Sequence, residues 1–158
     1  MSYAWYALDM GKTRTGRAKS ILGRQYKIAA ARANFSAVMA AAERGEFPVV
    51  RRADVPVVLI RRDDLDATLE SAAPFEPVTS IHNGQVSIWL EAVPVHGNGA
   101  NYADAEDDFL DALIDYAELW YAELRYAPNH KQNGELVRRI AMYAERRDEL
   151  REVVFAED

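Results

Sequence analysis

The sequence predicts an α+β protein in two parts. The first is a small unit of strand, helix, β-hairpin and helix, and the second has a strand, a loop, a long helix and a C-terminal helix. Apolar residues recur at helical spacing in some segments and alternate in others. A stretch with two prolines and no periodicity separates the two parts. Hydrophobic residues make up 49% of the 158 residues, which is typical of a globular protein.

Residues 26–30 are predicted to form the first strand. The next segment has apolar side chains spaced as on one face of a helix, so a helix is expected there. These side chains are Phe35, Val38, Met39 and Ala42. Gly45 stands where a helix takes a left-handed cap.

Two short apolar runs, residues 48–50 and 55–60, then predict a hairpin with Ala53-Asp54 as its turn. Asp63 and Asp64 open a further short helix, because acidic side chains suit the positive end of the helix dipole. The prolines of residues 72–80 mark the domain boundary. The predicted organisation is therefore an extension, a first domain, a linker and a second domain, at residues 1–24, 25–71, 72–80 and 81–158.

In the second domain, residues 86–92 alternate between apolar and polar as a half-buried strand does. Residues 94–99, rich in glycine and proline, are expected to form an irregular loop. Asn101 can cap a long helix, with Asp104 three residues into it. Apolar residues from Phe109 to Leu124 give that helix a wide stripe. A last helix is expected from Asn133-Gly134. Its apolar stripe consists of Leu136, Ile140, Tyr143, Leu150 and Val154.

Charge is segregated along the chain. Residues 1–62 carry twelve Lys/Arg and four Asp/Glu, whereas residues 63–158 carry seven and twenty-one. This pattern suggests two partners of opposite charge, although chance segregation on solvated surfaces is an alternative. The basic extension, residues 1–24, is interpreted either as a disordered tail or as an arm that adds phosphate contacts on DNA.

The candidate DNA-binding residues of the first domain are Arg32, Asn34, Arg51 and Arg52. An arginine at a helix start or beside a hairpin turn can reach a phosphate or a guanine edge. A two-fold dimer would let two such units read two half-sites. The alternative is that each is an ordinary surface arginine.

Residues 26–69 resemble the DNA-binding half of the Phd/YefM family of bacterial antitoxins. The family segment Ala-Gly-Glu-Pro-Val-Val is similar to Arg44-Gly45-Glu46-Phe47-Pro48-Val49-Val50, with one inserted residue, and the hairpin Arg-x-Gly-x-Pro-Val to residues 52–57. The resemblance implies dimerisation through hydrophobic faces and operator contacts by Arg32 and Arg52, with Arg51 as a neighbour. This chain lacks the hairpin glycine, so Asp54 is expected to accept a turn geometry that glycine takes freely.

Residues 86–118 are similar to the start of HicB-like antitoxin domains, which implies that the second domain binds a toxin. The candidate toxin-binding residues are Asp107, Asp111, Trp120 and Tyr121. The acidic helix could act as a decoy for a basic toxin cleft. The alternatives are a solvated helix face, core packing of the aromatics, or Mg²⁺ ligation by Asp107 and Asp111 with Glu91.

The sequence therefore predicts a cytoplasmic, non-enzymatic antitoxin of a type II toxin–antitoxin system. It would neutralise a toxin by direct binding, repress its own operon, and form a homodimer or a higher even oligomer. No cofactor, metal site or membrane segment is expected, and cysteine is absent. The alternative functions are a stand-alone DNA-binding regulator whose second domain oligomerises or senses a ligand, and, more remotely, a metal-dependent nuclease.

Overall fold

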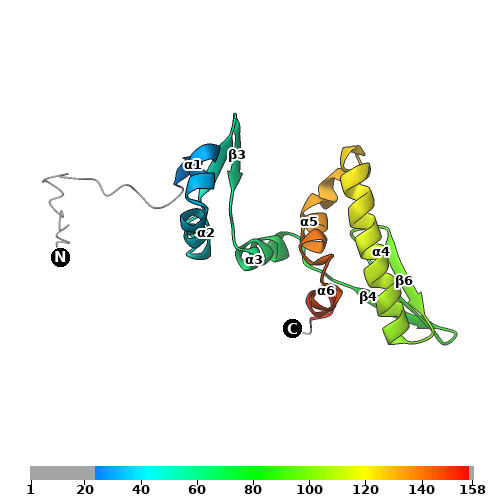
Figure 1. Cartoon of the computed structure of the whole chain (residues 1–158). Coiled ribbons are helices and arrows are strands. Elements are labelled where there is room, and N and C mark those ends of the chain that lie inside the picture. The colour runs from blue at the N-terminus through cyan, green and yellow to red at the C-terminus, as the bar shows by residue number, and fades with distance from the viewer. Residues whose placement is uncertain (1–23, 157–158) are drawn as a thin grey trace, which may run out of the picture. The chain divides into compact units, whose positions relative to one another are not determined.

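The computed structural model describes residues 24–156, and its fold is α+β, as the sequence predicts (Figure 1). The chain divides into two compact units, one ending at Arg61 and one beginning at Arg62. The first unit consists of β1 (Gln25–Lys27), α1 (Ile28–Ala33), α2 (Phe35–Glu43), β2 (Val49–Arg52) and β3 (Val55–Val58). The second consists of α3 (Arg62–Ala72), β4 (Val78–His82), β5 (Gln85–Leu90), β6 (Val95–Gly99), α4 (Tyr102–Ala122), the 3-10 turns Leu124–Tyr126 and Lys131–Asn133, α5 (Gly134–Tyr143) and α6 (Arg147–Val154).

In the first unit, β1 pairs in parallel with β2, and β2 pairs antiparallel with β3. The two helices α1 and α2 connect β1 to β2. Residues 28–30 were predicted to end the first strand, but they form the first turn of α1, because the alanine-rich run at 28–33 strongly favours a helix. Asn34 separates α1 from α2, and its side-chain amide donates to the Ala30 carbonyl oxygen at 3.0 Å.

Gly45 ends α2 as predicted, with a φ of 75°. Its amide donates to the Ala42 oxygen, and the Glu46 amide donates to the Ala41 oxygen. These two bonds form a Schellman motif, which satisfies carbonyls that the end of a helix would leave without partners. Phe47, the residue inserted relative to the Phd/YefM pattern, also adopts the left-handed region, with a φ of 49°.

The β2–β3 hairpin turns at Ala53-Asp54 as predicted, but the strained residue is a different one. Ala53 has a φ of 52°, whereas Asp54 is not among the described residues with positive φ. A positive φ at the first central position alone is the pattern of a type II′ turn, which favours glycine at that position. The expectation that Asp54 takes the glycine-like geometry is therefore wrong, and Ala53 takes it.

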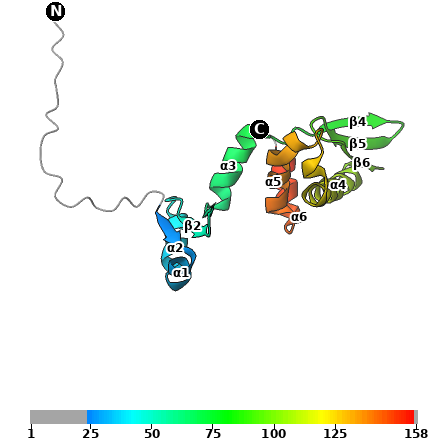
Figure 2. The same ribbon diagram turned by 90° about the horizontal axis from the view of Figure 1, so that it is seen from above.

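The second unit has its core between a sheet and a helix. The strands β4, β5 and β6 form an antiparallel meander along α4 (Figure 2). Val86, Ile88 and Leu90 of β5 are buried and alternate with less buried residues, as the sequence predicts. Phe109 and Leu113 of α4 are fully buried against this sheet in one hydrophobic cluster.

Two strands of this sheet were not predicted. β4 begins at Val78, inside the predicted linker, and β6 spans Val95–Gly99, where an irregular loop was expected. The loop prediction is wrong because the glycines of β6 serve close packing. A Cβ atom on Gly97 would lie 2.3 Å from the Phe109 amide nitrogen, and one on Gly99 would lie 2.3 Å from the Ala105 amide nitrogen. Glycine in a strand often marks such a close backbone approach.

The long helix begins as predicted. The Asn101 side-chain oxygen accepts from the Asp104 amide at 3.0 Å, and its amide group donates to the Asp104 carboxylate at 2.8 Å. The helix ends at Ala122, several residues before the predicted end at Pro128-Asn129. The predicted last helix is two helices, α5 and α6, joined at residues 144–146. Its whole predicted apolar stripe is nevertheless buried.

The helix α3 packs against α5 in the second unit. The sequence prediction groups it with the preceding hairpin. None of the helices between residues 24 and 156 is long and apolar enough to cross a membrane.

Candidate functional site

The predicted DNA-binding residues lie on three elements of the first unit. Arg32 is exposed in the last turn of α1, so it does not begin a helix as the sequence prediction assumed. Asn34 follows it and uses its amide group on the Ala30 oxygen. Arg51 and Arg52 are the last two residues of β2, and both are exposed. The basic extension, residues 1–24, for which a tail and a DNA-contacting arm were the two interpretations, lies outside the described residues except for Arg24.

Arg51 and Arg52 point to opposite faces of the sheet, because successive side chains of a strand alternate. Arg51 pairs in register with Lys27 of β1, and its Nε donates to the Gln25 side-chain oxygen at 3.0 Å. The face of Arg51 therefore carries a second cation, Lys27, which the sequence prediction did not select. Only the strand register brings these two residues together, since they lie 24 positions apart.

The face of Arg52 is apolar. Val55 and Val57 of β3 share this face with Arg52, and both are more than half exposed. On α2, Val38 and Ala42 of the predicted apolar face are buried, but Phe35 is 61% exposed and Met39 37% exposed. The first unit thus leaves several large apolar side chains in contact with solvent.

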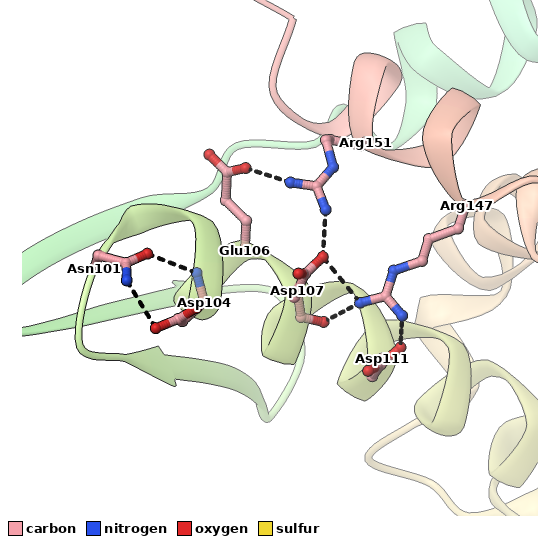
Figure 3. Close-up of polar contacts among 7 residues, drawn as sticks. All are labelled: Asn101, Asp104, Glu106, Asp107, Asp111, Arg147 and Arg151. Carbon is pink, nitrogen blue, oxygen red and sulfur yellow. Dashed lines mark hydrogen bonds and ion pairs between the residues drawn. The ribbon is translucent and has the colours of Figure 1, made fainter.

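The acidic residues of α4 meet two arginines of α6 (Figure 3). Arg151 donates to Glu106 at 2.7 Å and also pairs with Asp107. Arg147 donates to the Asp107 carboxylate at 3.3 Å and pairs with Asp111. The two predicted toxin-binding carboxylates, Asp107 and Asp111, are therefore both engaged within the protein, although each remains more than half exposed.

These carboxylates are bound by arginines and are not arranged as metal ligands. Glu91 lies in the turn after β5. Among residues 24–156, no group of three or more His, Asp and Glu side chains is placed to hold a metal ion. The ion pairs instead fasten α6 to the first half of α4, a contact that links residues 36 to 45 positions apart in the sequence.

Trp120 and Tyr121, the two aromatic candidates, have different surroundings. Trp120 is 7% exposed, and its indole nitrogen donates to the His130 carbonyl oxygen at 2.8 Å. Nearby, Asn133 donates to the Tyr116 hydroxyl at 2.7 Å, and that hydroxyl lies 3.0 Å from His130 Nδ1. Trp120 is thus part of the core, whereas Tyr121 is 43% exposed.

A buried arginine on α5 was missed by the sequence analysis. Arg139 is 2% exposed, and it donates from Nε to Asp66 at 3.0 Å and from a terminal nitrogen to Glu70 at 3.1 Å. Its guanidinium carbon also lies 4.7 Å from the centre of the Phe75 ring. The signal was present, because Arg139 occupies the i+3 position of the stripe that begins at Leu136.

Tyr143 lies beside the Arg139–Asp66 pair. Its burial, and then its hydrogen bond to Asp66, raise the pKa of the phenol to about 12. Both effects favour the neutral phenol, since burial withdraws water from the phenolate and the hydrogen bond to Asp66 requires the phenol proton. The Arg62 guanidinium lies over the same ring, 5.2 Å from its centre.

In the first unit, the exposed Arg44 and the mostly covered Glu46 form a close pair, with 2.6 Å between Nε and Oε1. The hydrogen bond to Arg44 lowers the pKa of Glu46, and the same bond raises the pKa of Arg44. This pair flanks Gly45 at the end of α2, so it reinforces the turn.

Comparison with known proteins gives two findings. A model of the PHD-like family, described as the antitoxin of toxin–antitoxin, RelE/RelB, TA systems, matches residues 23–155. The structure is similar to a crystal structure of an antitoxin part of a proposed toxin/antitoxin system from Syntrophomonas wolfei subsp. wolfei, with a TM-score of 0.64 and 16% identity over 85% of this chain and 98% of that one. At this identity the likeness shows a shared fold. No curated protein matches the chain.

Proposed function

The chain belongs to the PHD-like family of antitoxins of toxin–antitoxin systems, and from this premise we propose that it neutralises a cognate toxin by direct binding and represses its own operon by binding operator DNA. Family membership identifies it as a non-enzymatic regulatory protein. The match across residues 23–155 carries the proposal, because it covers both compact units. We propose a cytoplasmic location.

We propose more specifically that residues 25–71 are a Phd/YefM-type dimerisation and DNA-binding region, that residues 72–80 connect, and that residues 81–158 bind the toxin in a HicB-like manner. The element order of the first unit, strand, two helices and hairpin, supports the first assignment. The assignment of residues 81–158 is supported by the three-stranded meander β4–β6, which is followed by the acidic helix α4. Within one chain, α3 packs on α5, so this helix of the proposed DNA-binding region is part of the second compact unit.

Arg32, Asn34, Arg51 and Arg52 are the proposed DNA-binding residues, and the structure suggests Lys27 as an addition. Phosphate contacts by Lys and Arg supply affinity, and contacts to base edges supply specificity. Since Arg51 and Arg52 face opposite sides of the sheet, we propose that they have different roles. Arg51 with Lys27 would bind the phosphate backbone, and Arg52, on the other face of the sheet, would contact the operator beside the dimer interface.

We propose that the exposed apolar residues of the first unit cover one another in a homodimer, from which higher even oligomers can form. Exposed clusters of large apolar side chains commonly mark protein interfaces. Phe35 and Met39 share the apolar face of α2 with the buried Val38. Light scattering should report a dimer for the purified chain, and Phe35→Lys should shift it toward the monomer.

DNA binding is tested by a mobility shift with the promoter region upstream of the gene. Arg32→Ala with Arg52→Ala should abolish specific binding while the circular dichroism spectrum is unchanged. Arg125→Ala with Arg138→Ala, two exposed arginines of the second unit, is the matched control and should bind as the wild type does. Unchanged affinity of the first double variant at moderate salt would remove the assignment.

Toxin neutralisation is tested by growth rescue with the adjacent reading frame. If that frame alone arrests growth and co-expression of this chain restores it, direct binding is then measured with the two purified proteins. A harmless neighbour would favour the alternative function, a stand-alone DNA-binding regulator, in which the folded second unit would oligomerise or sense a ligand.

A further inference from the structure

A groove runs between the second half of α4 and the end of α5, away from the ion pairs that join α4 to α6. Its apolar lining is contributed by both helices and by the turn after α5: Ile114, Ala117, Tyr121, Ala141, Met142 and Ala144. Three of the six are alanines, so the floor lies close to the two helix backbones. From Ile114 to Tyr121 the groove follows about two turns of α4.

The rims of the groove carry one carboxylate on each side. Glu118 of α4 and Glu145 after α5 both line it, and within residues 24–156 neither has a hydrogen bond or an ion pair. The third charged lining residue, Arg146, is already paired with Glu149 at 2.9 Å. The acids of the first half of α4 differ, because Arg147 and Arg151 engage them. Two carboxylates without an ion-pair partner among the described residues therefore flank this groove.

Tyr121 is held in position at the groove. Its ring packs edge-on against Trp120, with 5.4 Å between the ring centres, and Trp120 is fixed by its bond to the His130 oxygen. An exposed tyrosine whose ring is already held in place loses little further freedom on binding, and tyrosine is among the residues that dominate binding energy at protein interfaces. Of the four predicted toxin-binding residues, Tyr121 alone combines exposure with the absence of an ion pair in the described part of the chain.

We propose that this groove docks an amphipathic helix of the cognate toxin, with its apolar side chains on the floor and its Lys or Arg side chains beside Glu118 and Glu145. An apolar groove between two helices suits an apolar helix face, and the two rim carboxylates require basic flanks. This inference rests on the proposed function, because it names the surface by which the chain binds the toxin.

The experiment measures the affinity of the full-length chain for the purified product of the adjacent reading frame, at low and at moderate salt. Tyr121→Ala should weaken binding by at least about tenfold. Tyr102→Ala, which changes another exposed tyrosine of the same helix, is its control and should bind as the wild type does.

The double variant Glu118→Lys with Glu145→Lys should also weaken binding by at least about tenfold, and it should lose the salt dependence that the wild type shows. Its matched control is Glu91→Lys with Glu152→Lys, two exposed glutamates away from the groove. All variants are compared by thermal unfolding, so that a loss of binding is not a loss of fold.

The outcomes separate this inference from the proposed function. Wild-type binding that the groove variants leave unchanged overturns the groove and retains the antitoxin. If the wild type itself fails to bind the neighbouring product, both are overturned. If the groove variants instead reduce the oligomeric state of the isolated chain, the occupant is a second copy of this protein, and the inference is wrong.

Discussion

Arg139 of α5 donates from Nε to the carboxylate of Asp66 on α3 at 3.0 Å, although the guanidinium is almost wholly buried. A second donor reaches Glu70, and the cation also lies over the Phe75 ring. One buried side chain thus fixes both α3 and the segment that follows it to the second unit.

Arg139→Ala should therefore cost about 3 kcal/mol of unfolding free energy, because it leaves the mostly buried Asp66 carboxylate without its partner and opens space beside Phe75. Hydrogen exchange should also speed up in α3 more than in α4. Arg138→Ala is the matched control. Arg138 is exposed and lies 3.5 Å from Glu135, so its loss should change stability by about 0.5 kcal/mol or less. Equal effects of the two substitutions would contradict the anchoring role.

Gly97→Ala and Gly99→Ala should each destabilise the protein by about 3 kcal/mol or more. The added Cβ would meet the backbone of α4, which cannot move aside as a flexible side chain can. Gly134→Ala is the control, since the nearest atom to its added Cβ is the end of the Arg138 side chain at 3.4 Å. Urea denaturation of the three variants measures the difference, and similar midpoints would refute the close packing.

Ala53→Gly should stabilise the first unit by about 1 kcal/mol, because an L-residue pays roughly that amount for a left-handed conformation. Asp54→Gly should not stabilise it, because position 54 lacks the positive φ and glycine adds freedom to the unfolded chain. Thermal unfolding of the two variants tests which residue of the turn is strained. A gain at position 54 alone would restore the expectation drawn from the sequence.

Tyr143→Phe should change the response of stability to alkaline pH. The folded state raises the pKa of this phenol from 10 to about 12, so it holds the proton more tightly than the unfolded chain. The resulting stabilisation is complete below about pH 10 and disappears as the pH rises toward 12. The free energy of unfolding of the wild type should therefore fall more steeply than that of the variant between these two values.

The parts of the fold that could be predicted are those with local signals. The Asn101 cap, the apolar stripe of α4 and the left-handed Gly45 each depend on residues within a few positions of one another. The strand β6 was missed because its glycines resemble a loop until α4 is known to lie against them. β4 was missed because the prolines before it read as a linker.

The candidate site was less predictable, because its residues contact partners that lie far away in the sequence. The sequence predicts Asp107 and Asp111 as part of an acidic surface available to a toxin. In the structure both form ion pairs with arginines of α6, Arg147 and Arg151. For both Trp120 and Tyr121 the sequence leaves toxin binding and core packing as alternatives. The structure buries Trp120, with its indole bonded to the His130 oxygen, and leaves Tyr121 exposed. Helical spacing places Trp120 on the same stripe as Phe109 and Tyr116, but it does not show which residues from other segments cover that stripe.

The contact between β6 and α4 also has a consequence for how the chain folds. Gly99 lies against Ala105 and Gly97 against Phe109, so this close backbone contact joins residues only six and twelve positions apart. Contacts of such low contact order close small loops and form early. We expect β6 and the first half of α4 to be structured in the folding transition state, before α5 and α6 are added, with φ-values that decline toward the C-terminus.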